Sequence, residues 1–438
     1  MIVFLCFFCM PLHAKERMIS LKECIDIALS NNTMILISAE DKKETVAKYR
    51  LAKSQSNIKI NAEARTVQYN VPTTSGAAVY STQNNTFGLF SGLTAWYNIF
   101  DKKADENNIV AQLSLDVTKI NNQKIRDDII FNVKKAYFDY LQARANLTLR
   151  KKVHDKYMEK LNLARILFQK GLRPILDVSR TEVGMASASI EYQRAVVEEK
   201  RTKMVLFSNL GVENTDIEIL PKDIDVLPEM KYDSKELFNL SDIYSADIQS
   251  IRVQKKINKE LIDLERASNY PTVNFMVSLG YENRYLFNFS LTENYYNNIS
   301  RWEPAIYGML SASLPLYSGG AIAARIDIAQ ANYNKTVYKE RELVMNLQNM
   351  IIYNLSTLAD LLKQIKMSEL NIKNSRNQLL LAQKSYESGV ISLLDLQDAE
   401  MSLLNAELGL IYARYQYLST VAKLSNIVGL GEDVLCRK

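Results

Sequence analysis

The chain has 438 residues, of which 47% are hydrophobic and 24% are charged, and its formal net charge is +5. This is the composition of an ordinary folded protein, and the charge is spread along the sequence without the basic block typical of nucleic-acid-binding proteins. Of its four cysteines, Cys6 and Cys9 lie in the predicted signal peptide over 1–14 and Cys24 and Cys436 lie near opposite ends of the remaining chain, so these and the two histidines provide no metal-ligand spacing. The sequence therefore predicts no nucleic-acid partner, no metal site and no cofactor.

Residues 1–14 form a short apolar run that ends at the small residue Ala14, directly before the charged Lys15. We interpret residues 1–14 as the apolar core and cleavage site of a secretory signal peptide without its basic start; a buried N-terminal strand is the alternative. No later run approaches the ~18 apolar residues of a membrane-spanning helix. An exported chain of this kind is soluble, peripheral to a membrane, or a β-barrel.

The rest of the chain is predicted to contain two repeats, residues 15–211 and 236–430, joined by a linker over 212–235 and followed by a short tail over 431–438. In the first repeat we expect a helix over 33–55, strands over about 57–69 and 86–99, a long helix over 102–170 and a helix over 174–210. In the second repeat we expect a helix over 241–268, strands over about 272–284 and 305–317, a long helix over 320–388 and a helix over 392–428. Each long helix would span roughly 100 Å, and the two shorter helices of each repeat together match that length.

The repeats are recognised where residues 168–185 align with residues 386–403 at an offset of 218 positions. This offset places four identical pairs on each other: Gly171 on Gly389, Leu176 on Leu394, Asp177 on Asp395, and Glu182 on Glu400. A duplicated unit that cannot bury its own apolar faces must bury them against its copy or against other subunits. The duplication therefore predicts assembly.

The predicted strands alternate between apolar and polar residues, most clearly over Thr272–Glu282. This pattern suits a strand between lipid and a watery lumen, and equally a strand between a protein core and bulk water. Long polar loops over 70–85 and 285–304, and aromatic residues near the strand ends, favour the membrane alternative. Since about eight strands are needed to close the smallest membrane barrel, the chain must oligomerise, and three copies with twelve strands are the simplest closed solution.

A heptad pattern runs along the last predicted helix. Large residues recur every seven positions, and mostly small residues follow three behind each: Leu396, Leu403, Leu410, Tyr417 and Leu424, then Ala399, Ala406, Ala413, Thr420 and Ile427. This predicts a closely packed helix pair. The first repeat keeps the small positions but has Glu199 at a large one, which predicts looser packing there.

In the order of its duplicated elements the chain resembles the TolC family of outer-membrane efflux and secretion channels, from Ser20 to Gly429. The segments that carry the resemblance are Leu21-Lys-Glu-Cys-Ile-Asp-Ile-Ala28, Tyr270-Pro-Thr-Val, Leu314-Pro-Leu-Tyr-Ser-Gly-Gly320 and the two Gly-x4-Leu-Asp turns. The first repeat departs from the pattern, with Ser56 where the second has Pro271 and Lys102-Lys103 where it has Gly319-Gly320.

The resemblance implies a mainly α fold with β strands, in which a homotrimer forms a twelve-stranded outer-membrane β-barrel that continues into a periplasmic α-helical barrel. The implied function is a passive exit duct, localised to the cell outer membrane. It would serve a tripartite efflux or type I secretion system with a periplasmic adaptor (membrane fusion protein) and an inner-membrane pump of the RND or ABC type.

The resemblance also assigns roles to the two helix–turn–helix ends. Gly171, Leu172, Gly389 and Val390 would dock the adaptor, although these glycines also simply turn the chain. Asp177, Asp395, Asp398 and Tyr386 would form the periplasmic aperture or gate. A capping box between Ser392 and Asp395 is the alternative for Asp395. Some relatives pair the tyrosine with a basic residue, but Ile391 stands at that position, which argues against such a lock.

Two other classes of protein compete with the channel hypothesis. A secreted coiled-coil scaffold whose strands pack in water would share the helical patterns and the alternating strands. An enzyme has little support, because the carboxylates scatter along helices, no glycine-rich phosphate loop follows a strand, and no nucleophile constellation is present.

Overall fold

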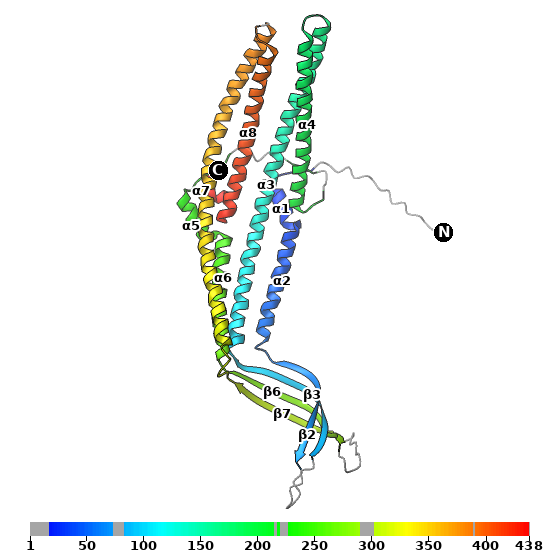
Figure 1. The fold of residues 1–438 in the computed structure, drawn as a ribbon, viewed down its shortest axis with the longest axis vertical. Helices are drawn as coiled ribbons and strands as arrows, with labels where there is room; N and C mark the ends of the chain where they lie inside the picture. Colours follow the sequence, from blue (N-terminus) through cyan, green and yellow to red (C-terminus); the bar gives the residue numbers. More distant parts are fainter. Residues whose placement is uncertain are drawn as a thin grey trace, which may run out of the picture. The chain divides into compact units, whose positions relative to one another are not determined.

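The computed structural model describes residues 17–72, 83–213, 217–219, 227–289, 302–388 and 390–437 (Figure 1). The predicted signal peptide over 1–14 and most of the two predicted strand-connecting loops lie outside the described residues. The chain forms two compact units. One comprises the chain up to Asp41, Ile120–Ser250 and Glu340–Lys438, and the other comprises Lys42–Lys119 and Ile251–Lys339. None of the helices in these described ranges is both long and apolar enough to cross a membrane.

Four helices form two hairpins: α3 (Lys102–Gln169) with α4 (Ile175–Leu210), and α7 (Ala321–Glu387) with α8 (Leu393–Val428). Within the first unit their order is α4–α3–α8–α7, so α4 and α7 lie at the two ends of the array (Figure 1). Three ion pairs link neighbours: Arg165 with Glu182 between α3 and α4 (2.8 Å), Lys160 with Glu400 between α3 and α8 (2.6 Å), and Arg376 with Glu407 between α7 and α8 (3.3 Å).

Six of the ten heptad positions of α8 are buried, and the other four, Leu403, Ala406, Leu410 and Thr420, are partly buried. Leu396, Ala399, Ala413, Tyr417 and Leu424 are all 5% exposed or less, as the sequence pattern predicts. In α4 the small positions are buried as well, while Glu199 is only half-buried. The Tyr417 hydroxyl donates to the carbonyl of Pro228 at 2.6 Å, and burial raises the pKa of this phenol to about 12.

Each repeat begins with a short helix, and the sequence reasoning missed both. These are α1 (Leu21–Asn31) and α5 (Ser234–Tyr244), each started by a capping box, Ser20 with Glu23 and Asp233 with Glu236. Each is followed by a longer helix, α2 (Thr33–Ser54) or α6 (Ala246–Arg266), after one extended residue, Asn32 or Ser245. The predicted single helix over 241–268 is therefore wrong: the chain breaks at Ser245, and a 3₁₀ turn, η1 (Ala267–Asn269), follows α6.

Each short helix packs against the end of a hairpin helix at a glycine. Gly211 and Gly429, which are 218 positions apart, end α4 and α8 with φ values of 69° and 78°. A Cβ atom would lie 2.7 Å from the Asn31 carbonyl oxygen at Gly211 and 2.5 Å from the Tyr244 carbonyl oxygen at Gly429. Both positions therefore require glycine for its conformation and for its size.

The second unit contains one antiparallel sheet of order β2–β3–β6–β7, formed by β2 (Lys59–Pro72), β3 (Gln83–Asp101), β6 (Thr272–Phe289) and β7 (Glu303–Ser313). The predicted strand over 305–317 is too long at its end, because β7 stops before Pro315, which has no N–H for the strand ladder. Strands β2 and β7 are the two open edges of this sheet.

In this sheet the apolar face is exposed and the polar face is buried, which is the reverse of a sheet in a water-soluble protein. Leu93, Leu279 and Ile306 lie in one register row of the apolar face and are 55%, 52% and 77% exposed. On the other face Thr94 and Ser278 are fully buried, and their hydroxyls are 2.9 Å apart. The apolar face is therefore the one left uncovered.

The linker and the tail join the first unit through two small sheets. Within the linker, β4 (Ile217–Ile219) pairs in parallel with β1 (Arg17–Ile19), and β5 (Glu229–Met230) pairs with β8 (Cys436–Arg437). A short helix, α9 (Glu432–Leu435), precedes β8 and buries Leu435 in the core. The predicted tail is thus part of the folded unit.

Candidate functional site

The candidate site is the pair of turns that end the two hairpins. After α3, Gly171 adopts φ +72°, and the amide of Leu172 donates to the Leu167 carbonyl at 2.9 Å. The second hairpin repeats this bond, with the amide of Val390 donating to the Ser385 carbonyl at 2.9 Å. Such bonds satisfy the carbonyls that a helix end leaves unpaired. Gly389 lies outside the described residues.

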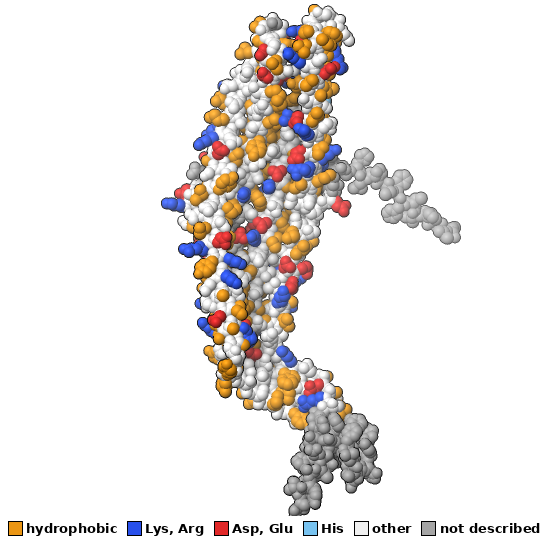
Figure 2. Space-filling model, viewed as in Figure 1, with side chains coloured by type: hydrophobic (Ala, Val, Ile, Leu, Met, Phe, Trp, Pro, Cys, Tyr) orange, Lys and Arg blue, Asp and Glu red, His pale blue; other side chains and the backbone are white. Residues whose placement is uncertain are grey.

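Apolar side chains project from both turns. Leu172 is 66% exposed and Val390, its equivalent in the second repeat, is 77% exposed. Leu176 and Leu394, one turn further along the chain, are each 53% exposed. Figure 2 shows hydrophobic side chains at the ends of the hairpins. Both hairpin ends therefore expose apolar side chains at equivalent positions, and the chain itself does not bury them.

The two turns start their following helices differently. Ser392 caps α8, and its hydroxyl accepts from the Asp395 amide at 3.3 Å while the Asp395 carboxylate accepts from the Ser392 amide at 2.9 Å. The Ser392 hydroxyl also donates to the Asp395 carboxylate at 2.7 Å, and this bond, together with the one from the Ser392 amide, holds the pKa of Asp395 below its usual value. The capping alternative for Asp395 is therefore confirmed. Pro174 takes the same place before α4 and offers no side-chain cap.

Asp177 and Asp398 are differently placed from Asp395. Asp177 is the third residue of α4 and is half-buried, and Asp398 is exposed one turn beyond Asp395. Neither carboxylate has a hydrogen bond or ion pair with another residue that the structure describes; only their backbone carbonyls are used, accepting from Thr181 and Ser402. Among the described residues, neither carboxylate is therefore engaged by another side chain.

Tyr386 has a cationic partner that the sequence reasoning missed. The guanidinium carbon of Arg173 lies 4.8 Å from the centre of the Tyr386 ring, so the turn of the first hairpin contacts the end of α7. Arg173 is equivalent, at the 218-residue offset, to Ile391, where a basic residue was sought and not found. In this chain the basic residue that contacts Tyr386 therefore comes from the first repeat, at the position equivalent to Ile391.

A second link between the hairpins lies further along the helices. Lys160 of α3 donates to Glu400 of α8 at 2.6 Å, and both side chains are largely buried, at 27% and 17% exposed. The equivalent glutamate of the first repeat, Glu182, instead pairs with Arg165 of its own hairpin at 2.8 Å. The duplicated glutamate therefore serves once within a hairpin and once between hairpins.

A duplicated array of antiparallel helices, a sheet with an exposed apolar face, and a pair of equivalent apolar turns define a protein of the outer-membrane channel class. The family model for outer membrane efflux proteins matches residues 24–197 and 240–430, which is most of the chain, and the chain belongs to this family.

Sequence relatives include the probable efflux pump outer membrane protein TtgC of Pseudomonas putida, 21% identical over 94% of this chain and 83% of its own length. The alkaline protease secretion protein AprF of Pseudomonas aeruginosa is 25% identical over 74% of this chain and 66% of its own length. Among solved structures, CusC has a TM-score of 0.79 at 18% identity, covering 94% of this chain and 92% of its own. The CmeC outer membrane channel of Campylobacter jejuni has a TM-score of 0.78 at 17% identity, covering 93% of this chain and 85% of its own. These likenesses agree with the mainly α fold with strands that the sequence predicts.

Proposed function

We propose that three copies of this chain close into one passive exit duct in the outer membrane, which receives cargo from an inner-membrane pump through a periplasmic adaptor. The observation that carries the proposal is the sheet with its apolar face uncovered and its polar face buried. In water this arrangement would leave Leu93, Leu279 and Ile306 against solvent. Against lipid it is the favourable one, because apolar side chains face hydrocarbon and polar side chains face a lumen. A secreted scaffold would require the opposite arrangement.

Open edges support closure by several copies. The sheet ends at β2 and β7, and the helical array ends at α4 and α7, so each array has one edge from each repeat. Joining β7 of one copy to β2 of the next preserves antiparallel pairing, and joining α7 to α4 does the same for the helices. A head-to-tail contact of this kind generates a closed ring. Three copies would give a sheet of twelve strands, enough to close a barrel.

An unpartnered heptad pattern on the edge helix supports the same contact. Five apolar residues spaced seven apart along α4 are between 53% and 68% exposed: Leu176, Val183, Ile190, Val197 and Met204. Each lies two positions before a residue of the inward heptad series Val178, Met185, Tyr192, Glu199 and Leu206, whose members are buried or half-buried. A second apolar seam on one helix indicates a second helical neighbour. In the proposed ring that neighbour is α7 of the adjacent copy.

The hairpin turns would form the end of the duct that faces the periplasm. We assign adaptor docking to the paired apolar positions Leu172 and Val390 and to Gly171 and Gly389, which shape the turns. We assign the aperture to Asp177, Asp395 and Asp398, with Tyr386 and Arg173 as a contact that holds the two hairpins together. Threefold symmetry would collect these carboxylates around the axis and favour cations in the opening.

The cargo is left open between two classes. One sequence relative named above is an efflux pump outer membrane protein and another is an alkaline protease secretion protein. In both cases the outer-membrane component is the exit, so the same duct would serve small molecules or polypeptides, according to the pump that delivers them.

Conductance in a planar lipid bilayer tests the proposal. Purified protein should give discrete channels that prefer cations, and Asp398→Asn should lower that preference more than Asp395→Asn does, because Asp395 is engaged in its own helix cap. Protein that inserts and conducts with unchanged selectivity in both variants would reject the aperture assignment. Protein that never conducts would reject the duct.

A further inference from the structure

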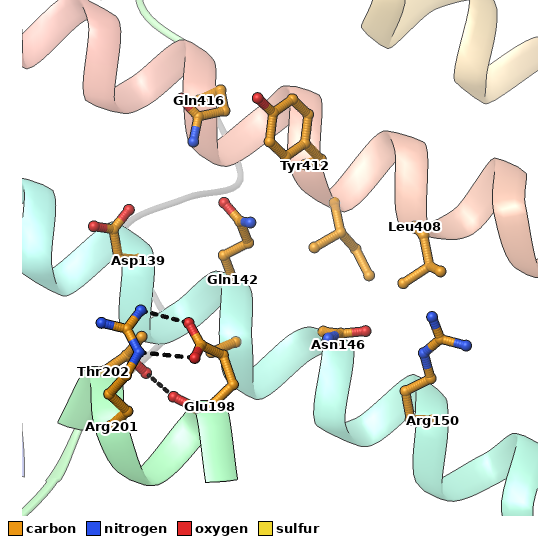
Figure 3. A pocket seen from close by; sticks show the side chains of 12 residues that line it. Asp139, Gln142, Asn146, Arg150, Glu198, Arg201, Thr202, Leu408, Tyr412 and Gln416 are labelled. Atoms are coloured by element: carbon orange, nitrogen blue, oxygen red, sulfur yellow. Dashed lines mark hydrogen bonds and ion pairs between the residues drawn. The ribbon is translucent and has the colours of Figure 1, made fainter. Parts of the chain in front are cut away.

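A polar groove lies in the first unit away from the hairpin turns. It has a volume of about 450 Å³ and is lined by α3, α4 and α8 (Figure 3). This is within the size range of small-molecule sites in proteins. In Figure 3 the Gln142 side chain projects from α3 towards α8, between Asp139 on one side and Asn146 on the other. No part of the gating or docking assignment uses these residues.

Three of the four charged side chains that line the groove form ion pairs, and one does not. Arg201 binds Glu198 through two nitrogens, at 2.6 and 2.8 Å, and Arg150 approaches Glu191 at 3.5 Å. Among the lining residues, all of which the structure describes, Asp139 is the charged side chain without an ion pair. It is half-buried, and burial raises the pKa of its carboxyl. The groove thus has one acidic group whose charge the protein does not balance by direct contact.

Two further acceptors lie on the same helix face. The amide oxygens of Gln142 and Asn146, three and seven positions after Asp139, are buried and have no hydrogen-bond partner among the described residues. Residues at these spacings share one side of a helix. A buried acceptor left unpaired is unfavourable, so a donor from a ligand would be stabilising there. Asp139 and Gln142 lie one turn apart and match a small ligand that carries N–H donors and a positive charge, whereas Asn146 lies roughly 10 Å from Asp139 along the helix axis.

The opposite wall of the groove is mainly apolar and aromatic, with one polar residue, Gln416. Leu408, Ile411 and Tyr412 of α8 line it, and Tyr412 is 53% exposed. An aromatic face also attracts a cation. A metal ion is disfavoured, because no group of three or more His, Cys, Asp or Glu side chains with metal-site geometry occurs among the described residues.

We propose that this groove binds small organic ammonium ions, with the charged nitrogen between Asp139 and Gln142 and the apolar body against Leu408, Ile411 and Tyr412. The site would be present once per chain. It is separate from the aperture, so a bound ammonium ion would interact with the duct at a second position.

Isothermal titration calorimetry of the full-length protein in detergent, with phenethylammonium as the probe, tests this site. We expect saturable binding at one site per chain, and at least tenfold weaker binding of the neutral analogue 2-phenylethanol. Asp139→Asn should weaken phenethylammonium binding at least tenfold, and Gln142→Leu should weaken it severalfold. Asp127→Asn is the matched control, because Asp127 is another half-buried carboxyl of α3 with a raised pKa and lies outside this groove.

Three results would overturn the proposal: no saturable binding, equal binding of 2-phenylethanol, or full affinity in a cooperatively folded Asp139→Asn variant. Loss of binding in Asp127→Asn as severe as in Asp139→Asn would also overturn it, since the effect would then be a general response of the helix. The conductance of the protein is measured separately, so a failure of this site does not depend on the duct.

Discussion

The guanidinium carbon of Arg173 lies 4.8 Å from the centre of the Tyr386 ring and thereby joins the turn of the first hairpin to the end of α7. Tyr386 also packs against a small cluster formed by Leu379, Leu396 and Ala399 of the second hairpin. A change in the distance between the two hairpin ends must break the Arg173 contact. Its geometry is therefore suited to holding the proposed aperture closed.

Removing this contact should favour the open aperture. A cation over an aromatic ring contributes about 0.5–2 kcal/mol, so Arg173→Ala or Tyr386→Leu should raise the open probability by roughly 2- to 30-fold. Tyr386→Phe keeps the aromatic face and should behave like the wild type. Single-channel recording measures this directly. Equal open probability in Arg173→Ala and the wild type would show that the contact does not restrain the hairpins.

The ion pair between Lys160 and Glu400 should matter more than its counterpart within the first hairpin. Both partners are mostly buried, so Lys160→Glu should lower the melting temperature clearly, and the double variant with Glu400→Lys should recover much of the loss. Arg165 and Glu182 are each about half exposed, and the same exchange there should change little. Thermal melting followed by circular dichroism distinguishes the two, and equal effects at both pairs would contradict this ranking.

Substituting Gly429 and Gly171 should distinguish a glycine that is needed for both its conformation and its small size from one that is needed for its conformation alone. Both have a positive φ, but a Cβ atom at Gly429 would lie 2.5 Å from the Tyr244 carbonyl oxygen, while one at Gly171 would have nothing within 4 Å. Gly171→Ala should cost about 1–2 kcal/mol of unfolding free energy, the cost of a left-handed alanine. Gly429→Ala should cost more, because α5 must move. Denaturant unfolding monitored by circular dichroism provides the comparison, and similar losses at the two sites would be the contrary result.

The carboxyls of Asp139 and Asp395 should make contributions to folding stability that change with pH in opposite directions. Burial raises the pKa of Asp139 in the folded protein, so its contribution to stability is lost as pH rises through that pKa. Asp139→Asn should therefore raise the melting temperature at neutral pH and have less effect at about pH 3, below the ordinary pKa. Hydrogen bonds from Ser392 lower the pKa of Asp395, and its contribution is lost as pH falls. Asp395→Asn should lower the melting temperature at neutral pH, with a smaller difference in acid. Shifts of the same sign at neutral pH would refute one of the two assignments.

Much of this architecture is predictable from sequence because its periodic signals are long. The heptad residues of α8 identify its buried face, and the alternation over Thr272–Glu282 identifies β6. Alternation alone does not determine which face of the sheet meets water, since apolar and polar residues alternate in either environment. The structure identifies the exposed face, because Leu279 is 52% exposed there. That exposure depends on how all four strands are arranged, which the alternation of residues does not specify.

The features that the sequence did not predict depend on short motifs or on contacts between distant parts of the chain. The capping boxes at Ser20 and Asp233 mark the starts of α1 and α5, and each is visible in four residues of sequence. The exposed heptad residues of α4 lie only two positions from the buried ones and are found by testing every register. Arg173 contacts Tyr386 across the two repeats, and no local pattern predicts a contact between hairpins 213 positions apart.

The mass of the detergent-solubilised protein tests closure by three copies most directly. One chain has a mass of 50.0 kDa before any processing. Light scattering corrected for bound detergent should give three times the chain mass, and Ile190→Asp with Val197→Asp, which place charges on the exposed heptad residues of α4, should yield smaller species. A wild-type protein that is a stable, water-soluble monomer with no affinity for lipid would contradict the account.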